Sequence, residues 1–238
     1  MNKQPFQFKQ FSVDQTGCAM KINTDGVLLG VTTNADNPTT ILDIGTGTGV
    51  IALMLAQRFI EAKIDAVEID ADASRTAERN FKASSFADRL DVYPFSFETY
   101  FDQFPENKYD LIVSNPPFYI SSLKSPGAKK TLAKHTDVDF FEKLIKCIAN
   151  HLSANGFCWL ILPVTLTDVI IELGANLSLY PQKVINVHSF THSEAHRVII
   201  CFGFSKVLVQ ITKFTIYKSV GVYSEEYQKS LQPYFIPF

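Results

Sequence analysis

The chain has 238 residues, of which 46% are hydrophobic and 13% aromatic, enough to bury a sizeable core. Its 22 basic and 24 acidic residues give a net charge of −2, which argues against a protein that coats nucleic acid indiscriminately and leaves room for a local basic patch. The first residues are polar and aromatic, and no apolar run is long enough to span a membrane, so a cytoplasmic protein is expected. The four cysteines form no C-x-x-C pair, so neither a metal site nor a disulfide framework is expected.

Strand-like and helix-like segments alternate after residue 40. The hydrophobic pattern predicts strands at 41–44, 64–69, 90–95, 109–114 and 157–162, and helices near 48–60, 71–84, 137–150 and 165–176. The segments that follow have no helix between them, which is typical of an antiparallel edge: 183–190, 196–204 and 213–218. We therefore expect one α/β domain over 1–238 with a doubly wound, mostly parallel sheet, in which residues 1–40 form an N-terminal extension.

Three alternating glycines stand between the first predicted strand and helix, in LDIGTGTGV (42–50). Glycines there allow a tight turn and a close approach of the backbone to a ligand. The dinucleotide fingerprint has the different spacing G-x-G-x-x-G and holds a pyrophosphate, which Asp43 would repel. Asp43 can face a cation, and Glu68 follows about twenty residues later, where a carboxylate meets a ribose. A plain turn and a solvated strand end would explain each feature alone, but their combination favours S-adenosylmethionine as cofactor.

The stretch LIVSNPPFYI (111–120) runs from an apolar strand into an asparagine, two prolines and an aromatic ring. Each proline fixes its own φ and restrains the residue before it, so the pair holds Asn115 rigidly. The Asn115 side-chain oxygen and the Pro116 carbonyl are suited to accept both hydrogens of an amine and turn its lone pair toward a methyl donor. Phe118 would stack on the planar group that carries the amine, and no metal is required. The alternative is an ordinary edge turn with Phe118 in the core.

The motifs DIGTGTG, AVEID and SNPPF, in this order, resemble those of class I S-adenosylmethionine-dependent methyltransferases that methylate amines. The resemblance implies a seven-stranded Rossmann-like methyltransferase sheet with an antiparallel C-terminal edge. It also implies that Glu68 holds the cofactor ribose, that Ile69 packs on the adenine, and that the methionine and ribose portions are lined by Asp43, Gly45, Thr46, Gly47 and Gly49. The family often has an acidic or amide residue after the third strand to read the adenine. Ser96 and Phe97 stand there in this chain, and Ser96 either substitutes for that residue or caps the next helix.

The flanking segments resemble the tRNA1(Val) adenine-N6 methyltransferase family over nearly the full chain, through residues 8–30, 125–136, 196–200 and 222–235. That family methylates the adenine just 3′ of the anticodon, nucleotide 37. The resemblance places Lys21, Thr24 and Asp25 near the methionyl end of the cofactor, with Asp25 helping to hold the ammonium, although NTDG is also an ordinary helix cap. Phe118 stands where tyrosine is common in adenine methylases, which removes a hydroxyl and keeps the stacking face.

A basic segment directly follows the catalytic motif, with no acidic residue from Lys124 to His135. We expect it to bind tRNA phosphates around a flipped base through Lys124, Lys129, Lys130 and Lys134, the alternative being a solvated surface loop.

Enzymes that act on rRNA guanine N2, DNA adenine or a protein glutamine amide share the N-P-P chemistry. The short N-terminal segment leaves no room for the helical domain of glutamine methylases, and no DNA target-recognition insertion is visible. A non-catalytic binding module would not need the amine clamp.

Overall fold

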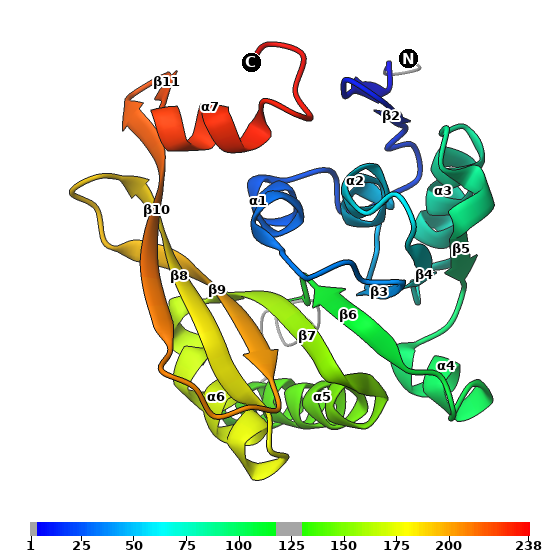
Figure 1. Ribbon diagram of the computed structural model, residues 1–238, viewed down its shortest axis with the longest axis vertical. Coiled ribbons are helices and arrows are strands. Elements are labelled where there is room, and N and C mark those ends of the chain that lie inside the picture. The colour runs from blue at the N-terminus through cyan, green and yellow to red at the C-terminus, as the bar shows by residue number, and fades with distance from the viewer. Residues whose placement is uncertain (1–3, 118–129) are drawn as a thin grey trace.

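The computed structural model describes residues 4–117 and 130–238, with the backbone alone over 130–137. Its centre is a nine-stranded sheet with the order β11-β10-β8-β9-β7-β6-β3-β4-β5 (Figure 1). The strands of this sheet are β3 (Thr40–Ile44), β4 (Lys63–Val67), β5 (Leu90–Tyr93), β6 (Tyr109–Ser114), β7 (Leu152–Pro163), β8 (Tyr180–Phe190), β9 (Ala195–Gly203), β10 (Gln210–Ser219) and β11 (Val222–Tyr223). A separate antiparallel pair is formed by β1 (Phe6–Gln7) and β2 (Ser12–Val13).

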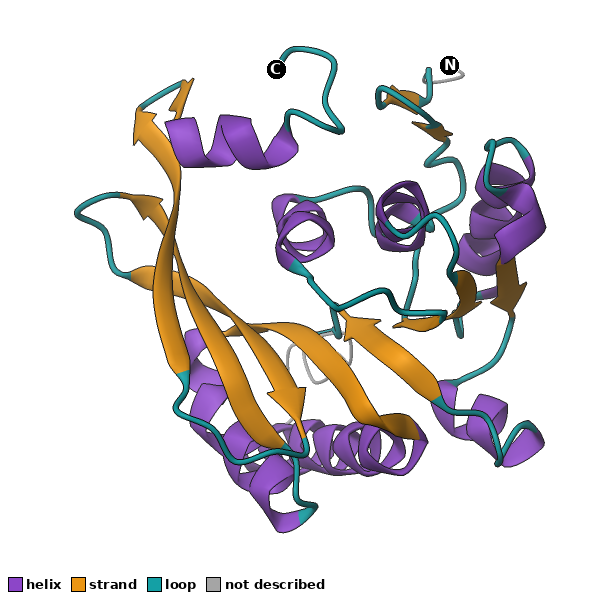
Figure 2. Ribbon diagram, viewed as in Figure 1, coloured by secondary structure: helices purple, strands orange, loops and turns teal. Residues whose placement is uncertain are grey.

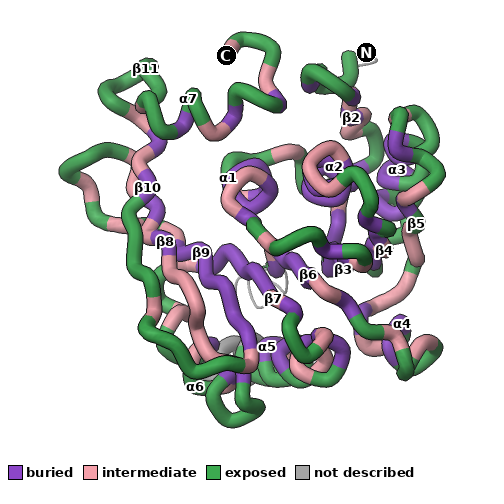
Figure 3. The backbone as a smooth tube through the Cα atoms, in the orientation of Figure 1, coloured by how far each residue is buried: buried purple, intermediate pink, exposed green. Residues whose placement is uncertain are grey.

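Helices cover both faces of the sheet (Figure 2). One face packs against α1 (Thr24–Thr32), α2 (Val50–Arg58), α3 (Ala71–Lys82) and α7 (Glu225–Leu231). The other face packs against α4 (Phe97–Gln103), α5 (Lys130–His151) and α6 (Thr167–Asn176). Two short 3₁₀ helices connect these elements, at Ala87–Arg89 and Val164–Leu166. Figure 3 shows the central strands as buried, as expected for parallel strands covered on both faces.

The predicted α/β sheet is confirmed, and seven of its strands, β3 to β9, follow the implied seven-stranded arrangement. Within it, β9 runs antiparallel to both β7 and β8, as expected for the C-terminal edge. The sheet then continues with β10 and β11, and β10 pairs with β8 in parallel, which differs from a series of antiparallel strands. The reason is that both edges of β9 are already occupied, so the chain crosses to the free edge of β8 and enters at the end where β8 begins.

The N-terminal segment, which precedes the sheet in the sequence, crosses α3 and then leads into α1. The Asn80 amide donates to the carbonyls of Asp14 and Thr48, at 2.9 and 2.8 Å, and its oxygen accepts from the Asp14 N–H at 2.8 Å. Asn80 therefore ties the N-terminal segment to the glycine loop. The division of the chain into one domain with an extension over 1–40 stays a prediction. Among the described residues, no helix is both long and apolar enough to cross a membrane.

Candidate functional site

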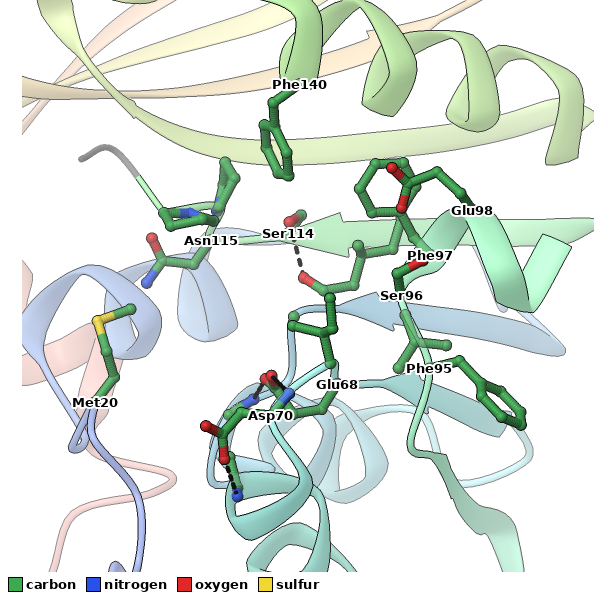
Figure 4. Close-up of a pocket in the computed structure, with 18 of the residues that line it drawn as sticks. Met20, Glu68, Asp70, Phe95, Ser96, Phe97, Glu98, Ser114, Asn115 and Phe140 are labelled. Atoms are coloured by element: carbon green, nitrogen blue, oxygen red, sulfur yellow. Dashed lines mark hydrogen bonds between the residues drawn. The ribbon is translucent and has the colours of Figure 1, made fainter. Parts of the chain in front are cut away.

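A cavity of about 550 Å³ opens at the carboxyl ends of the central parallel strands. Parallel strands all end at the same edge of a sheet, so the loops after β3, β4, β5 and β6 converge there. In Figure 4, Glu68 lies across the pocket from Phe140, with Asn115 on one side and Ser96 and Phe97 on the other. Four segments that are far apart in the sequence thus share one cavity.

Two of the three glycines face this cavity and the third does not. Gly45 and Gly47 have φ of +73° and +59°, and a Cβ built on either would meet nothing within 4 Å. Both line the pocket, so the glycine backbone leaves open space for a ligand. A Cβ on Gly49 would lie 2.5 Å from the Phe81 ring, so this glycine allows α2 to pack against α3. Gly49 is the residue before α2 and does not line the pocket.

Glu68 links the glycine loop to the end of β4. Its Oε2 accepts from the Gly47 N–H at 2.8 Å, and its Oε1 accepts from the Asp70 N–H at 2.8 Å. The carboxylate therefore holds the loop in place, and its side chain also lines the cavity. Ile69, next in the chain, lines the same wall and is 74% exposed, so its apolar surface is available to a bound ring.

Asp43 lies beneath the glycine loop and is completely buried. Its Oδ2 accepts from the Thr46 hydroxyl at 2.6 Å, while Oδ1 makes no hydrogen bond to the described part of the chain. Burial raises the pKa of Asp43 to about 7, the Thr46 hydroxyl and the Ala52 N–H offset part of the rise, and the Glu68 charge adds to it. A nearby cation would stabilise the charged form of this buried carboxyl group.

Replacing Asp43 with asparagine should stabilise the protein without ligand at pH 8. The pKa of Asp43 is about 7 in the folded chain and 3.8 when solvated, so the folded state binds more protons between these values. The contribution of Asp43 to stability is therefore full below pH 3.8 and is lost as pH rises to about 7. We expect the advantage of Asp43→Asn over the wild type to grow by on the order of 2 kcal/mol from pH 5 to pH 8, measured by denaturant unfolding. An advantage that does not change with pH would contradict the raised pKa.

The turn after β6 presents a second buried acceptor. The Ser114 hydroxyl donates to the Ile44 carbonyl at 2.8 Å, which joins the ends of β6 and β3. The next residue, Asn115, has a buried Oδ1 with no hydrogen-bond partner among the residues that the structure describes. Asn115, Pro116 and Pro117 all line the cavity. Because buried amide oxygens are normally satisfied, Asn115 is set up to receive a donor from a ligand.

The N-terminal residues predicted at the methionyl end divide into two groups. Lys21 lines a small recess of about 40 Å³ beside the main cavity, together with Thr46 and Asn115. Thr24 and Asp25 begin α1, line neither space, and follow Asn23, whose side chain caps the helix by accepting from the Gly26 N–H at 2.9 Å. The carboxylate of Asp25 accepts from Arg197 Nε at 2.8 Å, so it is engaged in an ion pair instead of facing the cavity.

Ser96 and Phe97 both line the cavity, and Ser96 also caps α4 by accepting from the Thr99 N–H at 3.2 Å. The sequence left open whether Ser96 helps to read the cofactor adenine or caps the next helix. In the structure Ser96 caps α4 and also lines the cavity. Phe140 of α5 was not predicted. Its ring lies 5.7 Å from that of Phe97 at 85°, so the two rings form an apolar corner. Phe140 stands in an ordinary helical pattern, and no sequence signal marks it.

Several pocket residues besides Phe140 were missed because they are apolar or lie outside the motifs, namely Ala19, Met20, Phe95 and Glu98. Three predicted residues, Phe118, Lys124 and Lys129, lie outside the described residues. Lys130 and Lys134 fall in the first turns of α5, where the backbone alone is described. Within 4–117 and 138–238, no group of three or more His, Cys, Asp or Glu side chains is arranged to hold a metal ion.

Comparison with known proteins identifies the family of this chain. The methyltransferase small domain family matches residues 18–167, which include the glycine loop, Glu68 and Asn115. A tRNA1(Val) (adenine(37)-N6)-methyltransferase of Pedobacter heparinus is 45% identical over 236 residues, covering 99% of this chain and 100% of that protein. A protein of the same name from Bacteroides fragilis is 39% identical, covering 99% of each chain.

The fold is also shared with solved methyltransferase structures. A predicted O-methyltransferase from Agrobacterium tumefaciens superposes with a TM-score of 0.68 over 88% of this chain and 95% of that one, at 14% identity. At that identity the likeness concerns the fold alone. The family model and the relatives confirm the family suggested by the motifs: the chain belongs to the tRNA1(Val) (adenine(37)-N6)-methyltransferase family.

Proposed function

We propose that this protein transfers a methyl group from S-adenosylmethionine to N6 of adenine 37 in tRNA1(Val). The relatives of this name from Pedobacter heparinus and Bacteroides fragilis match it at 45% and 39% identity over nearly the whole chain. The observation that carries the chemistry is the buried Asn115 Oδ1, which has no hydrogen-bond partner among the described residues and lies at the wall of a cavity that also contains Gly45 and Gly47. An acceptor fixed in this way matches the hydrogen of an exocyclic amine.

The residues around the cavity fit S-adenosylmethionine. When bound, this cofactor supplies a methyl group on a positively charged sulfur. Gly45 and Gly47 leave open space for its methionyl and ribose portions, and the cavity volume is in the range of small-molecule sites. Asp43 lies buried beneath the loop, where a bound cation would favour its charged form, and Glu68 supplies a carboxylate at the pocket wall. The apolar corner of Phe97 and Phe140 suits the adenine ring.

Asn115 and its prolines would act on the accepting base. An amine attached to adenine is a weak nucleophile because its lone pair is delocalised into the ring. The Asn115 oxygen and the Pro116 carbonyl would accept the two amine hydrogens, which shifts the nitrogen toward tetrahedral geometry and localises the lone pair. The two prolines restrict the backbone dihedral angles and so hold these acceptors in place. The residues need to supply position and polarity, and no general base among them has to remove a proton before attack.

Nucleoside mass spectrometry tests this proposal. The purified protein is incubated with S-adenosylmethionine and fractionated tRNA from a strain that lacks the gene, and we expect N6-methyladenosine in tRNA1(Val). A transcript with guanine in place of adenine 37 is the matched control. It should accept no methyl group, because its C6 carries no amine, while RNA affinity changes little since phosphate contacts dominate it. Another modified nucleoside, or methyl transfer only to rRNA, DNA or protein, would overturn the assignment.

A further inference from the structure

The small recess beside the main cavity has the first turn of α1 as one of its walls. Gly45, Gly47 and Asn115 line both spaces, so the recess and the cavity adjoin at the glycine loop. Lys21 and Asn23 line the recess alone, whereas the apolar corner proposed for the adenine ring belongs to the main cavity. The polar recess therefore suits the amino-acid end of S-adenosylmethionine, which carries an ammonium and a carboxylate.

An ion pair outside the recess holds this first turn of α1. Asp25 is the second residue of the helix, and its carboxylate accepts from Arg197 Nε at 2.8 Å. The Asp25 and Arg197 side chains are 18% and 23% exposed, so solvent screens their attraction less than it screens that of a surface pair. Arg197 lies at the start of β9, 172 residues later in the chain. The pair thus joins the helix that forms the recess wall to the central sheet.

The register of the sheet directs Arg197 toward α1. Arg197 pairs with Pro163 of β7 on one side and with Val187 of β8 on the other. Side chains alternate between the two faces along a strand, so Arg197 points to the same side as Ile199 and Cys201. Both of these are buried on the face that α1 and α2 cover. The pairing of β9 with its two neighbours therefore sets where the guanidinium lies.

The other end of α1 is held by different contacts. The Trp159 indole N–H donates to the Asn34 carbonyl at 3.0 Å, just after the helix ends. Arg58 of α2 donates to the Val31 carbonyl at 2.8 Å, in the last turn. Neither contact involves the first turn. Loss of the ion pair should therefore loosen the recess wall and leave the helix in its place.

We propose that Arg197 is a positioning residue for the cofactor: through Asp25 it fixes the first turn of α1, and with it the wall of the recess that receives the amino-acid end of S-adenosylmethionine. This inference rests on the proposed cofactor and gives Asp25 a different role from the one that the sequence predicts. If Asp25 held the cofactor ammonium directly, removing Arg197 would free its carboxylate and strengthen binding. If Asp25 acts by binding Arg197, the same change weakens it.

Calorimetric titration of the full chain with two ligands tests this role. The demethylated product, S-adenosylhomocysteine, keeps the amino-acid end, whereas 5′-methylthioadenosine keeps the adenosine and the sulfur and lacks that end. In Arg197→Ala and in Asp25→Asn we expect S-adenosylhomocysteine affinity to fall by about three- to tenfold, and 5′-methylthioadenosine affinity to stay at the wild-type value. The matched control is Lys82→Ala, which removes the exposed ion pair with Glu78 in α3 and should bind both ligands as the wild type does.

A double-mutant cycle shows whether Arg197 acts through Asp25. Losses from two residues that work as one pair are not additive. We therefore expect Asp25→Ala/Arg197→Ala to lose no more S-adenosylhomocysteine affinity than the weaker-binding single variant. Arg197→Lys keeps a cation beside Asp25 and should retain part of the affinity that Arg197→Ala loses.

Three results would overturn the positioning role. They are stronger S-adenosylhomocysteine binding by Arg197→Ala, an equal loss of affinity for both ligands, and fully additive losses in the cycle. The first would show that Asp25 holds the ammonium, the second a general effect on folding, and the third that Arg197 does not act through Asp25. Wild-type protein that binds neither ligand would instead refute the proposed cofactor itself.

Discussion

Replacing Asn115 with alanine is expected to lower the rate of methyl transfer to tRNA by roughly 100-fold or more, the usual cost of losing one preorganised polar group at a reacting centre. The side chain loses its buried Oδ1, which has no other partner among the described residues and is available to the substrate amine. S-adenosylmethionine affinity should be nearly unchanged, because the glycine loop and Glu68 remain. Single-turnover kinetics with saturating cofactor measures the transfer step directly.

A matched control for this variant is Asn176→Ala, at the exposed end of α6 away from the cavity. It should transfer methyl groups at the wild-type rate. If Asn115→Ala retained most of the single-turnover rate, the Asn115 oxygen would not hold the amine, and the proposed role of the N-P-P turn would be wrong. If the variant instead lost cofactor affinity, Asn115 would belong to the cofactor site.

Replacing Glu68 with alanine should weaken S-adenosylmethionine binding by roughly 10- to 100-fold, because hydrogen bonds to a charged group contribute about 1.5–3 kcal/mol. Two effects add in the same direction. The ribose loses its proposed acceptor, and the N–H groups of Gly47 and Asp70 lose the carboxylate that they contact at 2.8 Å each. The glycine loop is then less well ordered before binding. Isothermal titration calorimetry with S-adenosylmethionine and its demethylated product measures the loss.

Glu61→Ala is the control for charge, since Glu61 is exposed in the turn before β4, at the opposite end of that strand from Glu68. Its cofactor affinity should match that of the wild type. Glu68→Gln, which keeps one side-chain oxygen as an acceptor, should fall between the wild type and Glu68→Ala. Tight binding of NADH, with none of S-adenosylmethionine or its product, would refute the cofactor assignment altogether.

The amino-acid sequence by itself determined the order of the predicted strands and helices from residue 40 to 218 and the family, but not α4, β11 or α7. These features are local in the sequence. Alternating apolar segments indicate the strands and helices, and the turns after β3 and β6 need particular residues. Gly45 and Gly47 require backbone with positive φ, and the prolines after Asn115 restrict the chain. Such requirements are written in a few adjacent residues, so a single sequence reveals them.

The tertiary structure decided what depends on packing between distant segments. Gly49 appears in the sequence as one more loop glycine, yet its place is set by the Phe81 ring of α3. Asp25 appears as a cofactor ligand, yet Arg197, 172 residues later in the chain, engages its carboxylate. The parallel pairing of β10 with β8 follows from occupied strand edges, which no local pattern records. These outcomes depend on which surfaces pack against each other, and that packing exists only in the folded chain.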